Sequence, residues 1–188
     1  FVSRGLGDVY KRQVIDMSHS AEKSTLDAIE ISEKPIAITH ANPSFWHAAK
    51  RNKSNELLKV LSDSGGILGF SLYPHHLKNN TNCTLDSFCE MIARTSDIMN
   101  IKNIGIGSDL CLNQPDEIVE WMRNGTWSKN KNYGEGSKNK PGFPKQPGWF
   151  EDARGFFNIE KGLRKVGFSE EETNGILGNN WYNFYRNI

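Results

Sequence analysis

The stretch Val14–His40, VIDMSHSAEKSTLDAIEISEKPIAITH, contains the pattern that decides the fold of this chain. Short apolar runs at Val14–His19 and Ile36–His40 are each typical of a strand, and Ala21–Ile31 between them has its apolar residues at helical spacing. Ser20 is placed to cap this helix. A strand, a helix and a second strand predict a βαβ unit with parallel strands.

Further strands and helices follow in the same order. Ile67–Tyr73 and Ile104–Asp109 are predicted strands. A helix is predicted near Asn55–Ser62 because its leucines share one face, and another is predicted after Thr84, which is placed to cap an apolar stripe that runs to Met99. Strands that alternate with helices in this way predict an α/β fold with a parallel sheet.

The last third of the chain changes in composition before helices return. Asn124–Gly148 is rich in Gly, Lys, Asn and Pro, and we expect it to form a long surface loop. A helical period then covers Phe156–Val166, and Ser169–Glu172 has the pattern of a capping box whose helix stops at Gly178. We expect a final helix, containing Trp181, to pack on the body of the domain.

The first thirteen residues do not fit this pattern. Phe1–Gln13, FVSRGLGDVYKRQ, has no hydrophobic period, and it ends abruptly before the strand pattern at Val14. We therefore expect 1–13 to be a non-native leader and 14–188 to carry the fold, the alternative being a poorly ordered natural terminus.

Composition argues against several classes of partner. With a formal net charge of +1 over 188 residues, the chain gives no reason to expect nucleic acid or an anionic membrane. No stretch approaches the ~20 apolar residues of a membrane span, and no targeting signal is visible. Cys83, Cys89 and Cys111 lack metal-site spacing and are expected to be free or packing thiols.

Three chemically active side chains follow predicted strands. His19 and His40 end the first two strands, and Asp109 ends the fourth. The carboxyl ends of parallel strands meet at one edge, so these side chains are expected to converge there. Imidazole and carboxylate groups suit Zn²⁺. A histidine taken alone is more often a hydrogen-bonded structural residue, whereas two histidines and an aspartate at equivalent strand ends make the two interpretations about equal.

Four spaced strings occur at the ends of the predicted strands and in the loop after the second: DMSH at Asp16–His19, THAN at Thr39–Asn42, RN at Arg51–Asn52 and GIGSD at Gly105–Asp109. Together they resemble the membrane (renal) dipeptidase family of zinc metallopeptidases. Their spacing is similar to that of the family, since 21 residues separate the two histidines, and Arg51 and Asp109 lie 11 and 69 residues after His40. The resemblance extends to Ile188.

The resemblance implies a fold and a function. The fold would be the carboxy-terminal half, the last four β/α units, of a (β/α)₈ TIM-like barrel, and the activity would be hydrolysis of dipeptides with two zinc ions. His19 and His40 match the histidines that bind the second zinc. Arg51 matches the residue that holds the substrate carboxylate, and Asp109 matches the acid that contacts substrate and carries a proton from the metal-bridged water to the leaving amine.

Some family features are absent. Leu110–Cys111 replaces the family's usual aromatic-acid pair, and the H-x-D motif that supplies further ligands does not occur in the chain. These ligands and a bridging glutamate would lie upstream of Val14, so we expect the chain alone to be inactive. Asp16 is expected to orient its neighbours, whereas Arg51 as a solvated charge and Asp109 as a helix cap remain open alternatives.

Two other functions remain open. One is another metal-dependent amidohydrolase on the same barrel, acting on cyclic amides or esters, and the other is a non-catalytic pseudo-enzyme or binding module. The partner implied is a small peptide substrate, and a homodimer with a second copy stays open. The compartment stays unknown, with a soluble protein of bacterial type as the expectation.

Overall fold

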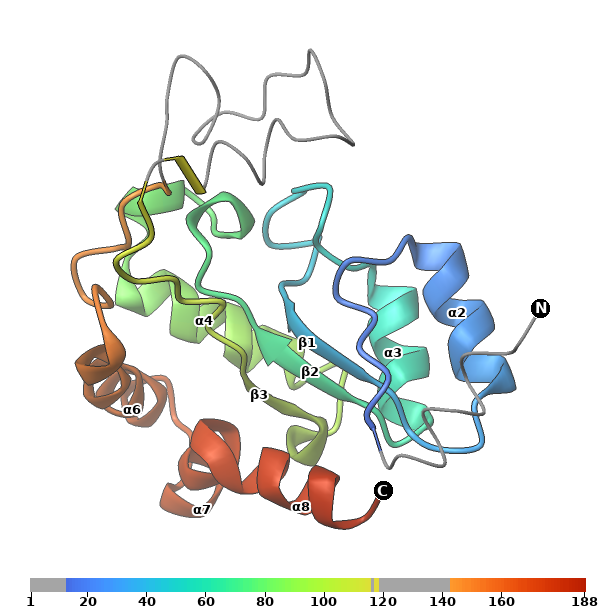
Figure 1. The fold of residues 1–188 in the computed structure, drawn as a ribbon. Helices are drawn as coiled ribbons and strands as arrows, with labels where there is room; N and C mark the ends of the chain where they lie inside the picture. Colours follow the sequence, from blue (N-terminus) through green and yellow to red (C-terminus); the bar gives the residue numbers. More distant parts are fainter. Residues whose placement is uncertain (1–12, 116, 119–142) are drawn as a thin grey trace.

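The computed structural model describes residues 13–115, 117–118 and 143–188, and it shows an α/β fold built on a parallel sheet (Figure 1). The strands are β1 (Ala37–Ala41), β2 (Ile67–Phe70) and β3 (Ile104–Ile106), in the order β1-β2-β3. Ala37 pairs with Ile67, and Leu68 pairs with Ile104. The predicted α/β class and parallel sheet are therefore confirmed.

The predicted strand at Val14–His19 is only a single bridge beside β1. The backbone N–H of Met17 donates to the Ala37 carbonyl at 2.9 Å, and the N–H of Ala37 donates to the Ile15 carbonyl at 2.9 Å. Asp16 thereby forms an isolated parallel bridge with Ala37. The segment leaves the sheet after Met17, which directs the following residues toward the carboxyl end of β1.

The two later strands end earlier than the sequence pattern predicts. β2 stops at Phe70 rather than Tyr73, because the chain turns into a 3₁₀ helix at Pro74–His76, where proline fixes the backbone and donates no N–H. β3 stops at Ile106 rather than Asp109. The two segments still meet beyond the strands, since the N–H of Leu72 donates to the Ser108 carbonyl at 3.1 Å.

Three helices connect the strands. They are α2 (Glu22–Ile31), α3 (Asn55–Asp63) and α4 (Leu85–Thr95), with α2 outermost against α3 (Figure 1). The leucines of α3 are buried as predicted, and Thr84 caps α4 as predicted by accepting from the N–H of Ser87 at 3.1 Å. The cap predicted for α2 is wrong, because Ala21 holds that position and the Ser20 hydroxyl turns toward the Met17 sulfur at 3.7 Å.

The carboxy-terminal helices are α6 (Phe156–Lys165), α7 (Glu170–Asn174) and α8 (Asn180–Arg186). Ser169 and Glu172 form the predicted capping box. The predicted stop at Gly178 is confirmed, because Gly178 leaves helical geometry with φ 179° and ψ −35°. The kink there separates the turn at Gly175–Asn179 from α8.

Trp181 of α8 joins the end of the chain to the sheet. Its indole N–H donates to the Ile106 carbonyl at 3.0 Å. A Cβ added at Gly69 or Gly105 would lie 2.9 Å or 2.5 Å from the indole, so the ring rests on the two bare backbones. The expected packing of the final helix on the body is thus confirmed.

Three further expectations concern the long loop, the cysteines and membrane spans. Residues 143–148, the described part of the predicted 124–148 loop, contain no helix or strand, and residues 124–142 and 1–12 lie outside the described residues. All three cysteines are free. Within the described residues, none of the helices has the length and apolar character that a bilayer crossing requires.

We predict that Gly105→Ala destabilises the fold by about 1–3 kcal/mol, because the added methyl group meets the Trp181 ring. Urea unfolding measures the loss. In a Trp181→Ala background the cost of Gly105→Ala should largely disappear. Gly69→Ala is the matched control, since its methyl group also meets the Thr39 carbonyl oxygen at 2.1 Å and its cost should persist. Equal behaviour of the two glycines in that background would contradict the prediction.

Candidate active site

The two predicted histidines meet at the carboxyl end of β1. His40 lies within β1, and His19 lies on the segment that bridges to it. Their Nε2 atoms are 3.0 Å apart, and their rings meet edge to face with centroids 5.0 Å apart. The structure therefore brings together two side chains that are 21 residues apart in the sequence.

Asp16 ties the two histidine-bearing segments together. Its Oδ1 accepts from the N–H and hydroxyl of Ser18 at 3.0 and 2.5 Å and from the N–H of Thr39 at 3.0 Å, and its Oδ2 accepts from the Thr39 hydroxyl at 2.8 Å. Burial raises the pKa of Asp16, but these hydrogen bonds outweigh it and hold the pKa below its usual value. Asp16 orients its neighbours, as the sequence predicts.

Thr39 fixes the tautomer of His40. Because its hydroxyl proton is given to Asp16, its oxygen must accept from His40 Nδ1, which lies 2.9 Å away. The Nδ1 of His40 therefore carries the ring proton, and its Nε2 has a lone pair directed at His19. An oxygen that holds the outer nitrogen of a histidine in this way is typical of metal-binding imidazoles.

Arg51 contacts the other histidine. Its Nη1 lies 2.9 Å from His19 Nδ1, and its Nη2 donates to the Ser18 carbonyl at 3.2 Å. A guanidinium group can only donate, so His19 Nδ1 accepts and the ring proton lies on Nε2. Burial and then the charge of Arg51 lower the pKa of His19, which keeps the ring neutral. Arg51 is thus part of this cluster rather than a solvated charge.

Asp109 lies beyond β3 at the same edge of the sheet. It is exposed and has a left-handed φ of 53°, which directs it away from the strand. Its charge raises the pKa of His19, against the stronger effects of burial and Arg51. Asp109 therefore acts electrostatically on His19. The helix that it would cap in the alternative interpretation lies largely outside the described residues.

A buried amide network holds the loop that carries Arg51. Asn42 donates from Nδ2 to the carbonyls of Ser71 and His76 at 3.0 and 3.1 Å and accepts from the N–H of Ser71 at 3.0 Å. Asn52 accepts from the N–H of Asn42 at 3.2 Å and donates to the carbonyls of His47 and His76 at 2.8 and 3.0 Å. Both amides have satisfied donors, and such networks rigidify what they join.

Two buried charge-capable groups complete the surroundings. Lys53 is 3% exposed and donates from Nζ to the Ser20 carbonyl at 2.9 Å, which steadies the turn after His19. His76 is 5% exposed, and its Nδ1 lies 2.9 Å from the Ser71 hydroxyl. Burial and then the charge of Arg51 lower the pKa of His76 to about 3, so this ring is neutral.

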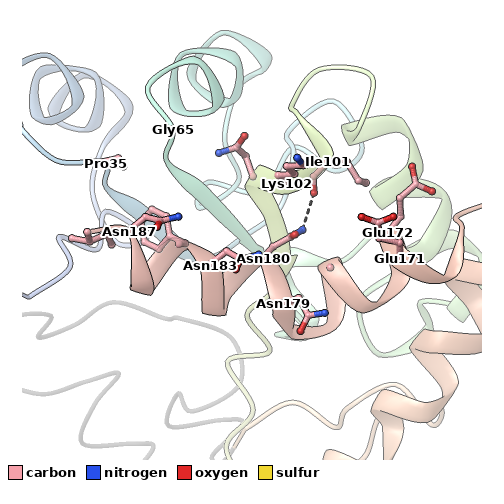
Figure 2. A pocket seen from close by; sticks show the side chains of 14 residues that line it. Pro35, Gly65, Ile101, Lys102, Glu171, Glu172, Asn179, Asn180, Asn183 and Asn187 are labelled. Carbon is pink, nitrogen blue, oxygen red and sulfur yellow. Dashed lines mark hydrogen bonds between the residues drawn. The ribbon is translucent and has the colours of Figure 1, made fainter.

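A hollow of about 480 Å³ lies at the opposite ends of the strands (Figure 2). Pro35, Gly65 and Asn103, which precede β1, β2 and β3, line it together with α8. Asn180 uses its amide there to bind the carbonyls of Ile101 and Ile104, both at 2.8 Å. This hollow is therefore separate from the histidine pair, and its amide serves to fasten α8 to the sheet.

The histidine pair has a spacing that suits one metal ion. Two nitrogens that each lie ~2.0–2.1 Å from a tetrahedral zinc ion are roughly 3.3 Å apart, close to the 3.0 Å between His19 Nε2 and His40 Nε2. Among the described residues no cluster of three or more His, Cys, Asp or Glu side chains forms a metal site. The chain thus offers two fitting imidazoles, and a hydrolytic zinc site needs at least one further protein ligand.

Comparison with known proteins identifies the family. The profile described as membrane dipeptidase (peptidase family M19) matches residues 12–120, a span that includes His19, His40, Arg51 and Asp109. The chain belongs to the membrane dipeptidase family. Dipeptidase ataJ of Aspergillus terreus is 29% identical over 100 residues, which cover 52% of this chain and 24% of that protein. Dipeptidase tcpJ of Claviceps purpurea is 20% identical over 176 residues, 93% of this chain and 34% of that protein.

Solved structures share the fold of this membrane dipeptidase family member. An amidohydrolase from Pseudomonas aeruginosa superposes with a TM-score of 0.84 at 28% identity over 97% of this chain and 54% of that one. A second structure is a metallo peptidase from Rhodobacter sphaeroides, liganded with a phosphinate mimic of the dipeptide L-Ala-D-Ala. It has a TM-score of 0.72 at 18% identity over 97% of this chain and 44% of that one. The chain therefore spans about half the length of these structures.

The sequence does not indicate the role of several residues around the site of this membrane dipeptidase family member. Ser18, Asn42 and Asn52 belong to the strings that resemble the family, but nothing in their type indicates that they join separate segments. Lys53 reads as an ordinary charge, although it is buried. His76 is buried as well. No local pattern predicts such burial, because it depends on contacts between distant segments.

We predict that Asn42→Asp lowers the free energy of unfolding by about 2–4 kcal/mol. The substitution places an oxygen against the carbonyl oxygens of Ser71 and His76, where the amide donated two hydrogen bonds. Urea unfolding tests this, with Asn187→Asp, at an exposed residue directly after α8, as the matched control. Equal free energies of unfolding of the two variants would contradict a stabilising role of the amide network.

We further predict that acid destabilises the fold through His76. Its folded pKa of about 3 lies below the unfolded value of 6.5, so between these values the unfolded state binds one more proton and stability falls as pH drops. Through His76 the free energy of unfolding then falls by up to about 1.4 kcal/mol for each pH unit. His76→Asn should make the free energy of unfolding less dependent on pH between pH 6.5 and 5. Identical slopes in urea titrations would refute this.

Proposed function

We propose that this chain carries part of the active site of a zinc-dependent dipeptidase that hydrolyses the peptide bond of dipeptides. The observation that carries the proposal is the pair of imidazole nitrogens 3.0 Å apart, with the Arg51 guanidinium directly beside them. Membership of the membrane dipeptidase family supports it. A cation site next to a bidentate carboxylate binder suits a short peptide with a free carboxyl end.

Each site residue then has a role. His19 and His40 would hold zinc through Nε2, with Thr39 keeping His40 in the tautomer that metal binding requires. Zinc, when bound, polarises the peptide carbonyl and lowers the pKa of an attacking water. Arg51 binds the carboxylate of the substrate and so orients the scissile bond. Asp109, exposed at the same edge, receives the proton of the water and passes it to the leaving amine.

The proposal includes the wider fold. The bridge at Asp16 and the three strands would be the last four strands of a (β/α)₈ barrel, with the site at the carboxyl ends of the strands. Active sites of such barrels gather ligands from several strands. The further zinc ligands, including those of a second ion, would therefore come from residues outside those described, and the described pair alone would bind zinc weakly.

A second candidate is an amidohydrolase acting on cyclic amides or esters. The Pseudomonas aeruginosa structure described as an amidohydrolase, at 28% identity, favours it. The two candidates would share the metal pair and differ in what they need from Arg51. A cyclic amide without a carboxylate gives a bidentate guanidinium no partner, so the role of Arg51 separates them.

We predict that the chain binds Zn²⁺ at the histidine pair. In competition with a chromophoric chelator, His19→Ala and His40→Ala should each weaken zinc binding by roughly tenfold or more, because each removes one of two ligands. His47→Ala is the matched control and should leave the affinity unchanged. Unchanged affinity in both site variants would reject the metal site.

A binding experiment with two peptides tests whether Arg51 binds the substrate carboxylate. The zinc-loaded chain should bind Ala-Ala roughly tenfold or more tightly than Ala-Ala carboxamide, measured by calorimetry, because charge-assisted hydrogen bonds to Arg51 are lost with the amide. Arg51→Ala should remove that preference. If the preference survives the substitution, Arg51 does not read the carboxylate and the amidohydrolase candidate gains.

A further inference from the structure

We propose that the hollow at the amino ends of the strands binds a saccharide, a neutral ligand rich in hydroxyl groups. The hollow measures about 480 Å³ and lies between α8 and the residues that precede the three strands (Figure 2). Its volume is within the roughly 300–1,000 Å³ that is usual for small-molecule sites. The inference goes beyond the proposed function and does not rest on it, because the histidine pair lies at the other ends of the strands.

Asparagine side chains dominate the α8 side of the hollow. Asn179, Asn183 and Asn187 follow one another at intervals of four residues, so they form an amide row along one face of the helix (Figure 2). All three are exposed, and their side chains make no hydrogen bond to another residue in the described part of the chain. Each amide can therefore offer a ligand both an N–H donor and a carbonyl acceptor.

Helix stability does not account for this amide row. Asparagine is a poor helix former, because its side chain competes for the hydrogen bonds of the backbone. Only the neighbouring Asn180 supports the fold, through its bonds to the carbonyls of Ile101 and Ile104. The amides of the row make no such bond among the described residues, so what they provide is hydrogen-bonding capacity on the wall of the hollow.

Asn180 adds a deeper acceptor to the amide row. It is only 8% exposed, and it uses Nδ2 for the two carbonyls, whereas its Oδ1 accepts from no other group of the described residues. A Cβ at Gly175, which also lines the hollow, would lie 2.9 Å from this oxygen. The bare backbone at Gly175 thus leaves the oxygen uncovered on that side. A hydroxyl group of a ligand can donate to it.

The charged groups of the hollow favour a neutral ligand. Glu171, Glu172 and Lys102 line it, which gives a formal charge of −1 from two carboxylates and one ammonium group. None of the three forms an ion pair with a described residue. The excess negative charge disfavours an anion. No cluster of three or more His, Cys, Asp or Glu side chains in the described part of the chain could hold a metal cation there.

The apolar part of the lining also suits a sugar. Pro35, Ile101, Phe184 and Ile188 contribute it. A sugar ring has C–H groups between its hydroxyl groups, so it can cover apolar side chains and bind amides at the same time. A peptide of the same size offers one N–H and one carbonyl for each residue, whereas each sugar ring offers several hydroxyl groups that both donate and accept. The density of amides in the hollow therefore favours the saccharide.

Titration with disaccharides, followed by ¹H–¹⁵N NMR of the chain, tests the proposal. The probes are maltose, cellobiose and N,N′-diacetylchitobiose at millimolar concentration. We expect at least one of them to shift the side-chain signals of Asn183 and the backbone signal of Gly175. In the double variant Asn179→Ala, Asn183→Ala the Kd of that disaccharide should rise roughly tenfold, because two hydrogen-bonding groups are lost.

Two controls accompany the double variant. Asn174→Ala removes an exposed asparagine at the end of α7 that does not line the hollow, and it should leave the Kd unchanged. Urea unfolding of the double variant should match the wild type, since neither amide binds another described residue. A loss of affinity then reports on the ligand contacts and not on the fold.

Each outcome decides for or against the proposal. Unshifted signals with all three disaccharides overturn it, and so does binding that the double variant leaves unchanged. If tetra-alanine shifts these signals and no disaccharide does, the hollow binds peptides and the saccharide proposal is overturned. His40→Ala should leave disaccharide binding unchanged, so the saccharide site and the zinc site can each fail without the other.

Discussion

The hydrogen-bonded carboxylate of Asp16 is the constraint on which the candidate site depends. It accepts four hydrogen bonds from Ser18 and Thr39, and these two residues directly precede His19 and His40. Two neighbouring segments are thereby fixed relative to each other at the residues adjacent to the histidines. An ionised group that is partly buried is costly unless it is fully hydrogen-bonded, and here the hydrogen bonds that stabilise it also set the spacing of the imidazoles.

Side-chain hydrogen bonds also join the other loops at this edge of the sheet. Asn42 and Asn52 bind the Arg51 loop to the end of β2, and Lys53 binds that loop to the turn after His19. Each of these contacts is made between a side chain and a backbone carbonyl. The loops are therefore fixed to one another where the sheet no longer pairs them, and the side chains that they carry meet with little freedom.

Much of this arrangement can be predicted from the sequence, because it follows from local pattern. The period of α3, the cap of α4 and the capping box of α7 depend on residues a few positions apart, and all three are confirmed. Strand length is less predictable, since β2 and β3 end where the chain turns toward the site. The strand-end position of His19 and His40 indicates that they converge, whereas the buried amides and His76 depend on long-range contacts that no local signal encodes.

The packing of the Trp181 indole affects how the chain folds during its synthesis. It covers the bare backbone of Gly69, a residue that leaves the ribosome 112 positions earlier. Until α8 emerges, β2 and β3 lack the ring that packs on their glycines and the donor that binds the Ile106 carbonyl. The nascent sheet is then open to wrong pairing until α8 has been synthesised.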